Sequence, residues 1–108
     1  MTHADAVAAL AALAHDHRLR IYRWLVEQGP EGLPAGAIAE RLGVPPSSLT
    51  FHLQHLNRAG LVHQRRVGRQ LIYAAHFDGM QDLIGFLTRN CCAASRGCAP
   101  AAEQEDAA

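Results

Sequence analysis

Residues 33–62 read LPAGAIAERLGVPPSSLTFHLQHLNRAGLV, and this stretch decides the fold. Ile38 and Leu42 are spaced as on one face of a helix, and Gly43 follows them as a turn. A second helix can begin at Pro46, because a proline in the first turn removes an N–H that has no helical partner there. Its apolar face would be lined by Leu49, Leu53 and Leu56. The stretch predicts two short helices, at 34–42 and 46–59, joined by a tight turn.

The hydrophobic period changes from helical to strand-like after Gly60. Residues 61–67 and 70–75 are expected to form two strands, with Gly68 and Arg69 as a two-residue hairpin turn. Further helices are predicted at 4–14, between Asp16 as a cap and a stop at Gly29-Pro30, and at 78–89. The expected fold is mainly α with a β-hairpin wing, a winged helix-turn-helix of four helices, two strands and a last helix.

The 108 residues suffice for one domain, which we place at 1–90, followed by a cysteine-bearing segment with a flexible end at 91–108. The first 15 residues lack a cationic start and contain Asp5, which argues against a signal peptide. No apolar run is long enough to span a membrane. We therefore expect a cytoplasmic protein whose thiols are reduced.

Charge is distributed unevenly along a chain whose formal net charge is zero. No acidic residue lies between Glu40 and Asp78, and that interval contains five arginines. A basic central segment predicts a polyanionic partner, although a solvated basic face is the plainer alternative. In a helix-turn-helix the second helix enters the major groove of DNA. The expected DNA contacts are Ser47, Ser48, Thr50, Phe51, His52, Gln54 and His55 on that helix, and Arg65, Arg66 and Arg69 on the wing.

Residues 33–44 and 47–62, together with the opening LAHDHRLRI at 13–21, resemble the core of ArsR-type (ArsR/SmtB) metalloregulators. The resemblance covers about residues 5 to 90. It implies a homodimeric winged-helix repressor, not an enzyme, whose first and last helices form the dimer interface. It also implies an imperfectly palindromic double-stranded operator, and an inducer that weakens DNA binding.

Two inducer sites of the resembling family are absent from this sequence. Residues 33–44 contain no cysteine, and the last predicted helix offers Asp78 and Asp82 but no histidine. What remains is the cluster of Cys91, Cys92 and Cys98, which resembles the vicinal cysteine pair of some arsenite-responsive members. Thiolates select soft, thiophilic centres, so As(III), or Sb(III), is the expected inducer and no organic cofactor is expected.

Several alternatives stay open. The cysteines could be small core residues. A redox or reactive-sulfur sensor could use a disulfide from Cys98 to Cys91 or Cys92. A thiol enzyme would need an activated nucleophile with acid–base partners, and the chain has no Cys-x-x-Cys motif. His15 and His17 could be metal ligands, but we expect them to cap or pack at the helix junction. Trp24 and Phe86 are expected to be core residues.

Overall fold

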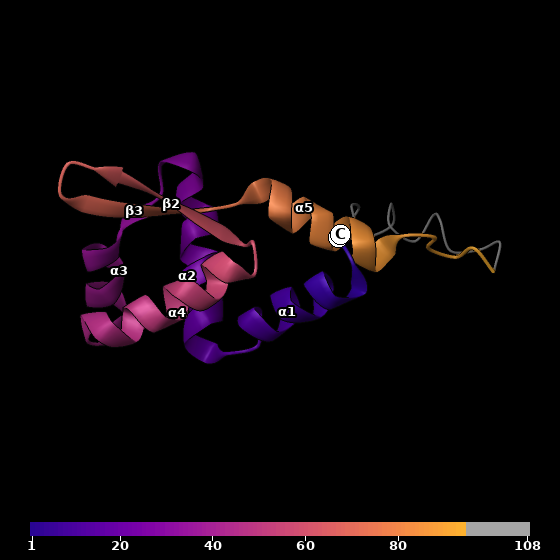
Figure 1. Cartoon of the computed structure of the whole chain (residues 1–108), viewed down its shortest axis with the longest axis horizontal. Helices are drawn as coiled ribbons and strands as arrows, with labels where there is room; N and C mark the ends of the chain where they lie inside the picture. Colours follow the sequence, from indigo (N-terminus) through magenta and orange to yellow (C-terminus); the bar gives the residue numbers. More distant parts are fainter. Residues whose placement is uncertain (95–108) are drawn as a thin grey trace, which may run out of the picture.

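The computed structural model describes residues 1–94, and Cys98 and the predicted flexible end lie outside the described residues. The helices are α1 (His3–Leu13), α2 (Asp16–Gln28), α3 (Ala35–Leu42), α4 (Pro46–Arg58) and α5 (Phe77–Thr88). A short 3-10 turn, η1 (Gly29–Glu31), follows α2. The strands are β1 (Leu33–Pro34), β2 (Val62–Val67) and β3 (Gln70–Ala75). The predicted winged helix-turn-helix is confirmed (Figure 1).

The wing is an antiparallel hairpin whose register runs from Val62 opposite Ala75 to Val67 opposite Gln70. Gly68 adopts a φ of 63° in the two-residue turn, a conformation that glycine reaches without a steric penalty. A third strand, β1, was not expected; it pairs Leu33 with Tyr73 and makes the sheet order β1-β3-β2. Pro34 was expected to open the third helix, but it pairs with β3 and precedes the first helical residue. A two-residue strand has too little alternation to be recognised in sequence.

The helix starts have identifiable caps. Thr2 and Asp5 form a reciprocal capping box at α1. Asp16 was predicted to cap α2, and this is wrong, because the cap is the ring of His15, which accepts from the backbone N–H of His17. Asp16 is instead the first helical residue, and its carboxylate lies 3.1 Å from Arg20 Nε.

The core lies between α2, α3 and α4 and the base of the sheet. Its largest fully buried side chains are Ile21, Leu25, Ile38, Leu53, Leu56, Leu61 and Val62. Trp24 and Phe86 are partly buried against this core, as expected. Among the described residues, no helix is long and apolar enough to cross a membrane.

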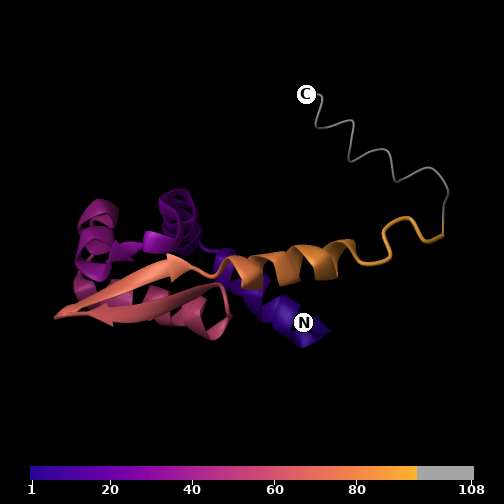
Figure 2. The same ribbon diagram turned by 90° about the horizontal axis from the view of Figure 1, so that it is seen from above.

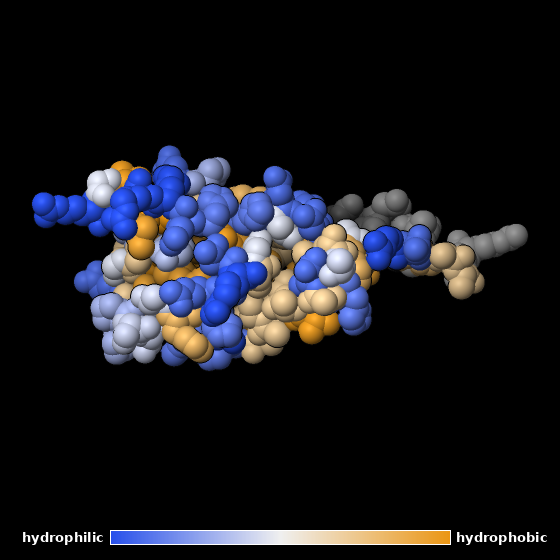
Figure 3. Space-filling model, in the orientation of Figure 1, coloured by the Kyte–Doolittle hydropathy of each residue, from blue (hydrophilic) through white to orange (hydrophobic). Residues whose placement is uncertain are grey.

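α1 and α5 lie side by side at the end of the domain opposite the hairpin tip (Figures 1 and 2). α1 buries three alanines, Ala6, Ala9 and Ala12. Val7 and Leu10 of α1, and Ile84 and Leu87 of α5, are exposed. Figure 3 shows apolar surface over α1 and hydrophilic side chains gathered at the hairpin tip. The two ends of the domain therefore differ in surface chemistry.

Candidate DNA interface and cysteine segment

α4 presents the predicted reading face to solvent. Five of the seven predicted contacts on this helix are exposed, namely Ser47, Ser48, Thr50, Phe51 and Gln54. Phe51 is 54% exposed, so its ring is accessible to a partner on this face. His55 is half-buried beside it, with the two ring centroids 4.6 Å apart. The face therefore combines hydroxyl, amide and aromatic groups.

His52 is a correction to the predicted DNA contacts, because it is buried with only 7% of its surface exposed. It follows Leu49 by three positions and precedes Leu56 by four, so it belongs to the buried stripe of α4. Its ring packs against His15, with centroids 4.7 Å apart, and its Nδ1 lies 3.4 Å from Arg18 Nη1. The helical period of the leucines was the signal that sequence reasoning overlooked.

Burial, together with the charges of neighbouring histidines and Arg18, lowers the pKa of His52 below its ordinary value. The pKa of His55 is also lowered, by desolvation and by the nearby arginines Arg18 and Arg58. Both rings therefore favour the neutral form at neutral pH.

The three wing arginines are not equivalent. Arg65 lies along the body of the domain and donates through Nη2 to the Glu31 carbonyl at 3.1 Å and through Nη1 to the Pro30 carbonyl at 3.4 Å. Arg66 points to the other face of β2, because successive strand residues alternate. Arg66 and Arg69 line a surface hollow with Gly36 and Ala37 of α3. All three arginines are exposed, but the Arg65 guanidinium is held against η1, whereas no side-chain hydrogen bond to another element is found for Arg66 or Arg69 in the part of the chain that the structure describes.

The vicinal cysteines follow the end of α5 after two residues. The Arg89 guanidinium lies over the Phe86 ring, 4.8 Å from its centroid, and the Cys91 N–H donates to the Thr88 carbonyl. Asn90 and Cys92 adopt left-handed φ angles of 60° and 62°, so the chain turns tightly just after the helix. Cys91 is exposed and Cys92 is half-buried, and their Sγ atoms are 3.5 Å apart. The pair thus lies at the surface and is not part of the core, and the third predicted ligand, Cys98, lies outside the described residues.

Within residues 1–94, one group of three side chains is close enough together that it could hold a metal ion, namely His15, His17 and His52. Sequence reasoning considered the first two and could not join them to His52, because their contact is tertiary. His15 and His17 do cap and pack at the helix junction, as expected.

Comparisons with known proteins agree with this geometry. The family model described as a helix-turn-helix domain matches residues 13–65. The transcriptional activator HlyU of Vibrio cholerae is 32% identical over 93 residues, which are 86% of this chain and 83% of HlyU. The solved structure of HlyU superposes with a TM-score of 0.65, covering 82% of this chain and 94% of that one.

Two further solved structures are similar. An ArsR-like transcriptional regulator from Rhodococcus sp. RHA1 has a TM-score of 0.69 and 31% identity, and the match covers 81% of this chain and 79% of that chain. The homodimeric winged helix-turn-helix domain of Mb0332 from Mycobacterium bovis, a possible ArsR-family regulator, has a TM-score of 0.64 and 28% identity. That match covers 80% of each chain.

Proposed function

Because the chain belongs to the ArsR family of winged helix-turn-helix transcriptional regulators, we propose that it is a repressor released from its operator by As(III) or Sb(III). The proposed ligands are the thiolates of Cys91, Cys92 and Cys98. The relatives are regulators and not enzymes, so the chain acts by binding DNA. HlyU is named an activator, so repression, like the choice of inducer, belongs to the proposal.

The DNA-binding half of the proposal is supported by α4 and the wing. The first turn of α4 contains no acidic residue and has no side-chain cap, so its backbone N–H groups can approach a phosphate. Gln54 and the serines can reach base edges in the major groove, and Phe51 can contact a thymine methyl. Arg66 and Arg69 extend beyond the helix to the flanking phosphates.

The apolar surfaces of α1 and α5 support a homodimer. Leu10 and Leu87 are 43% and 55% exposed, and Val7 and Ile84 accompany them at one end of the domain. A self-complementary patch of this kind is covered in a two-fold dimer. Such a dimer presents two copies of α4 away from the dimer interface. Paired recognition helices of this type contact DNA half-sites about one helical turn apart.

The inducer half is carried by one observation, the 3.5 Å separation of Cys91 Sγ and Cys92 Sγ immediately after α5. Adjacent cysteines form a strained ring if they join to each other, but both can bind one larger atom. Thiolates prefer soft centres, and trivalent arsenic takes three sulfur ligands. Cys98 follows at a distance in sequence that allows the chain to return and supply the third.

Coupling to DNA would run through α5. Its buried residues are Gly79 and Leu83, and its exposed face belongs to the proposed dimer surface. An inducer bound by the cysteines after Thr88 would shift this helix and change the spacing of the two copies of α4. The inducer can release DNA only if it binds the dimer conformation with low DNA affinity more tightly than the conformation that binds the operator.

The ligand assignment is tested by arsenic-edge absorption spectroscopy on the arsenite-loaded full chain. We expect three As–S bonds in the wild type and two in Cys98→Ser. Oxygen-only coordination in the wild type would refute the cysteine site. The DNA half is tested separately by selecting duplexes from a random pool, which should yield inverted repeats with half-sites about one helical turn apart.

The second candidate is a redox sensor, which the surface position of Cys91 favours. Two thiols would lose two electrons and two protons to a peroxide, forming a disulfide and water. Peroxide would then release DNA in the absence of arsenite, and dithiothreitol would restore binding. Release by arsenite under a phosphine reductant, with no release by peroxide from protein freed of reductant, would select the arsenic proposal over this one.

A further inference from the structure

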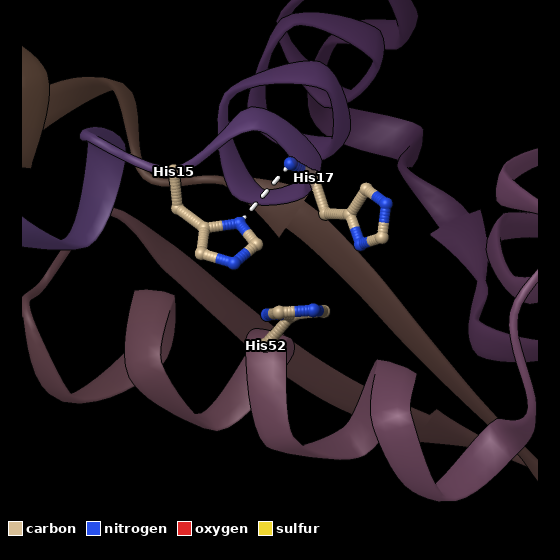
Figure 4. A group of neighbouring side chains, drawn as sticks. All are labelled: His15, His17 and His52. Atoms are coloured by element: carbon tan, nitrogen blue, oxygen red, sulfur yellow. Dashed lines mark hydrogen bonds between the residues drawn. The ribbon is translucent and has the colours of Figure 1, made fainter.

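Three imidazole rings meet where the junction between α1 and α2 lies against the middle of α4. His15 and His17 come from the junction, and His52 comes from the buried stripe of α4 (Figure 4). Ring nitrogens of the three, one from each residue, all lie within 4.8 Å of one another. In Figure 4 one ring nitrogen of His15 and one of His17 point toward the His52 ring.

The three ring nitrogens are close enough for one ion to draw them together. Zinc–nitrogen bonds are about 2.0–2.1 Å long, so three nitrogens around one ion lie closer together than 4.8 Å. To bind one ion, each ring would therefore move inward by about 1 Å. Such movement is available, because His15 is exposed at a chain bend and His17 is only half-buried. His52 is the fixed member, since it is buried on a regular helix.

Two hydrogen-bonding contacts compete with the ion. A neutral imidazole has one lone pair, and that of His15 accepts the His17 N–H at 3.1 Å. Arg18 Nη1 lies 3.4 Å from His52 Nδ1, and the same guanidinium is anchored by Nε donating to the Ala12 carbonyl at 2.7 Å. An ion must displace the cap and the long Arg18 contact. One cap and one weak contact are a smaller loss than the gain of three metal–nitrogen bonds.

The chemistry of the ligands selects the ion. The cluster contains only imidazoles, and imidazole suits zinc, copper, nickel and cobalt better than magnesium or calcium. Burial favours an unprotonated ring at His52, and a metal ligand must be unprotonated. Three imidazoles leave one tetrahedral position for water.

We propose that His15, His17 and His52 bind one divalent transition-metal ion of the zinc type, with water as the fourth ligand. The ion would join the middle of the reading helix α4 to the start of α2. The site shares no ligand with the cysteine segment, so it does not depend on the arsenic proposal.

The test is a Co²⁺ titration of the untagged full chain in which Cys91, Cys92 and Cys98 are all replaced by serine. Removing the thiols ensures that any tetrahedral Co²⁺ absorption comes from nitrogen and oxygen ligands. We expect one Co²⁺ per chain with a tetrahedral visible spectrum that Zn²⁺ abolishes by displacement. No tetrahedral spectrum, together with no heat of Zn²⁺ binding, would overturn the proposal.

The ligands are tested by His15→Asn and His17→Gln. Asparagine is a good N-cap, so His15→Asn removes the imidazole and preserves the cap of α2. Each variant should weaken Co²⁺ binding at least about tenfold. Removing a residue that only hydrogen-bonds to a metal ligand already weakens metal binding by about 10- to 100-fold, and removing the ligand itself should cost no less. His63→Gln, at an exposed histidine of β2, is the matched control and should bind as the parent does. Equal weakening in His63→Gln, or parent-like binding in His15→Asn, contradicts the site.

Arg18→Gln provides a test in which metal binding should become tighter. The positive Arg18 guanidinium repels a divalent cation. Even in water, repulsion between a single and a double positive charge about 5 Å apart lowers the affinity for the ion about tenfold. Arg18→Gln should therefore bind Co²⁺ about tenfold more tightly, provided that circular dichroism shows the native helix content. A folded variant that binds Co²⁺ more weakly would contradict the proposed position of the ion.

Discussion

Cys91 Sγ lies 3.5 Å from Cys92 Sγ in the turn that follows α5. The left-handed backbone at Cys92, with a φ of 62°, is part of what brings two adjacent side chains together at the surface. Because the turn begins at the end of the helix, an ion bound there would act on α5 directly.

The wing arginines should separate into two classes. Arg66→Ala should weaken binding to all DNA sequences and reduce the salt slope by about 0.9, because one phosphate contact is lost. Arg65→Ala should leave that slope nearly unchanged and lower the free energy of unfolding by about 1 kcal/mol, since its bonds to η1 are intramolecular. Fluorescence anisotropy across a salt series and urea unfolding measure the two effects. Identical salt slopes in both variants would show that the faces are wrongly assigned.

The reading helix should show a similar contrast between Gln54 and His52. Gln54→Ala should relax the preference for one base pair in each half-site by about 1–3 kcal/mol. His52→Gln should retain the selected sequence and lower the unfolding midpoint, because its side chain is buried. Selection of DNA sites by each variant distinguishes the two. A changed base preference in His52→Gln would restore it to the contact set.

The α5 helix offers a paired test of packing. A Cβ added at Gly79 would collide with the Gly60 carbonyl oxygen, whereas one at Gly85 meets nothing within 4 Å. Gly79→Ala should therefore destabilise the fold by about 1–3 kcal/mol through overpacking. Gly85→Ala should stabilise it by up to about 1 kcal/mol through helix propensity. Thermal unfolding of the two variants checks this, and equal midpoints would mean that α5 does not pack against the end of α4.

The dimer surface is tested by Leu87→Glu. A carboxylate at the centre of an apolar interface should shift the sedimentation coefficient to that of a monomer at micromolar concentration, because a charge would be buried without a partner. Phe51→Gln replaces a ring of similar exposure on α4 and should remain dimeric. A dimer in both variants would place the interface elsewhere.

The sequence predicted the helices and the hairpin well because their patterns are local. The spacing of Leu49, Leu53 and Leu56, and the glycines that end elements, depend only on near neighbours. β1 was missed because it is two residues long and exists only through its pairing with β3. The cap of α2 was misplaced by one residue, because Asp16 is the commoner capping residue and His15 takes the position instead.

The site was predicted less completely because the burial and contacts of its residues depend on how separate elements pack together. His52 was placed in the DNA interface on account of its polarity, although the helical period places it with the leucines. Arg65 and Arg66 look alike in sequence and differ only in which face of β2 each side chain occupies. The group of His15, His17 and His52 joins positions far apart in sequence, so periodicity could not reveal it.

The central claim is tested most directly by operator binding of the wild type and of Cys91→Ser/Cys92→Ser, with and without arsenite, under a phosphine reductant. The account predicts that both proteins bind the selected operator equally in the absence of arsenite. Arsenite should weaken wild-type binding by a factor within about 5 to 150, the usual range for coupling between two sites, and leave the variant bound. Release of the variant by the same concentration of arsenite would contradict the account.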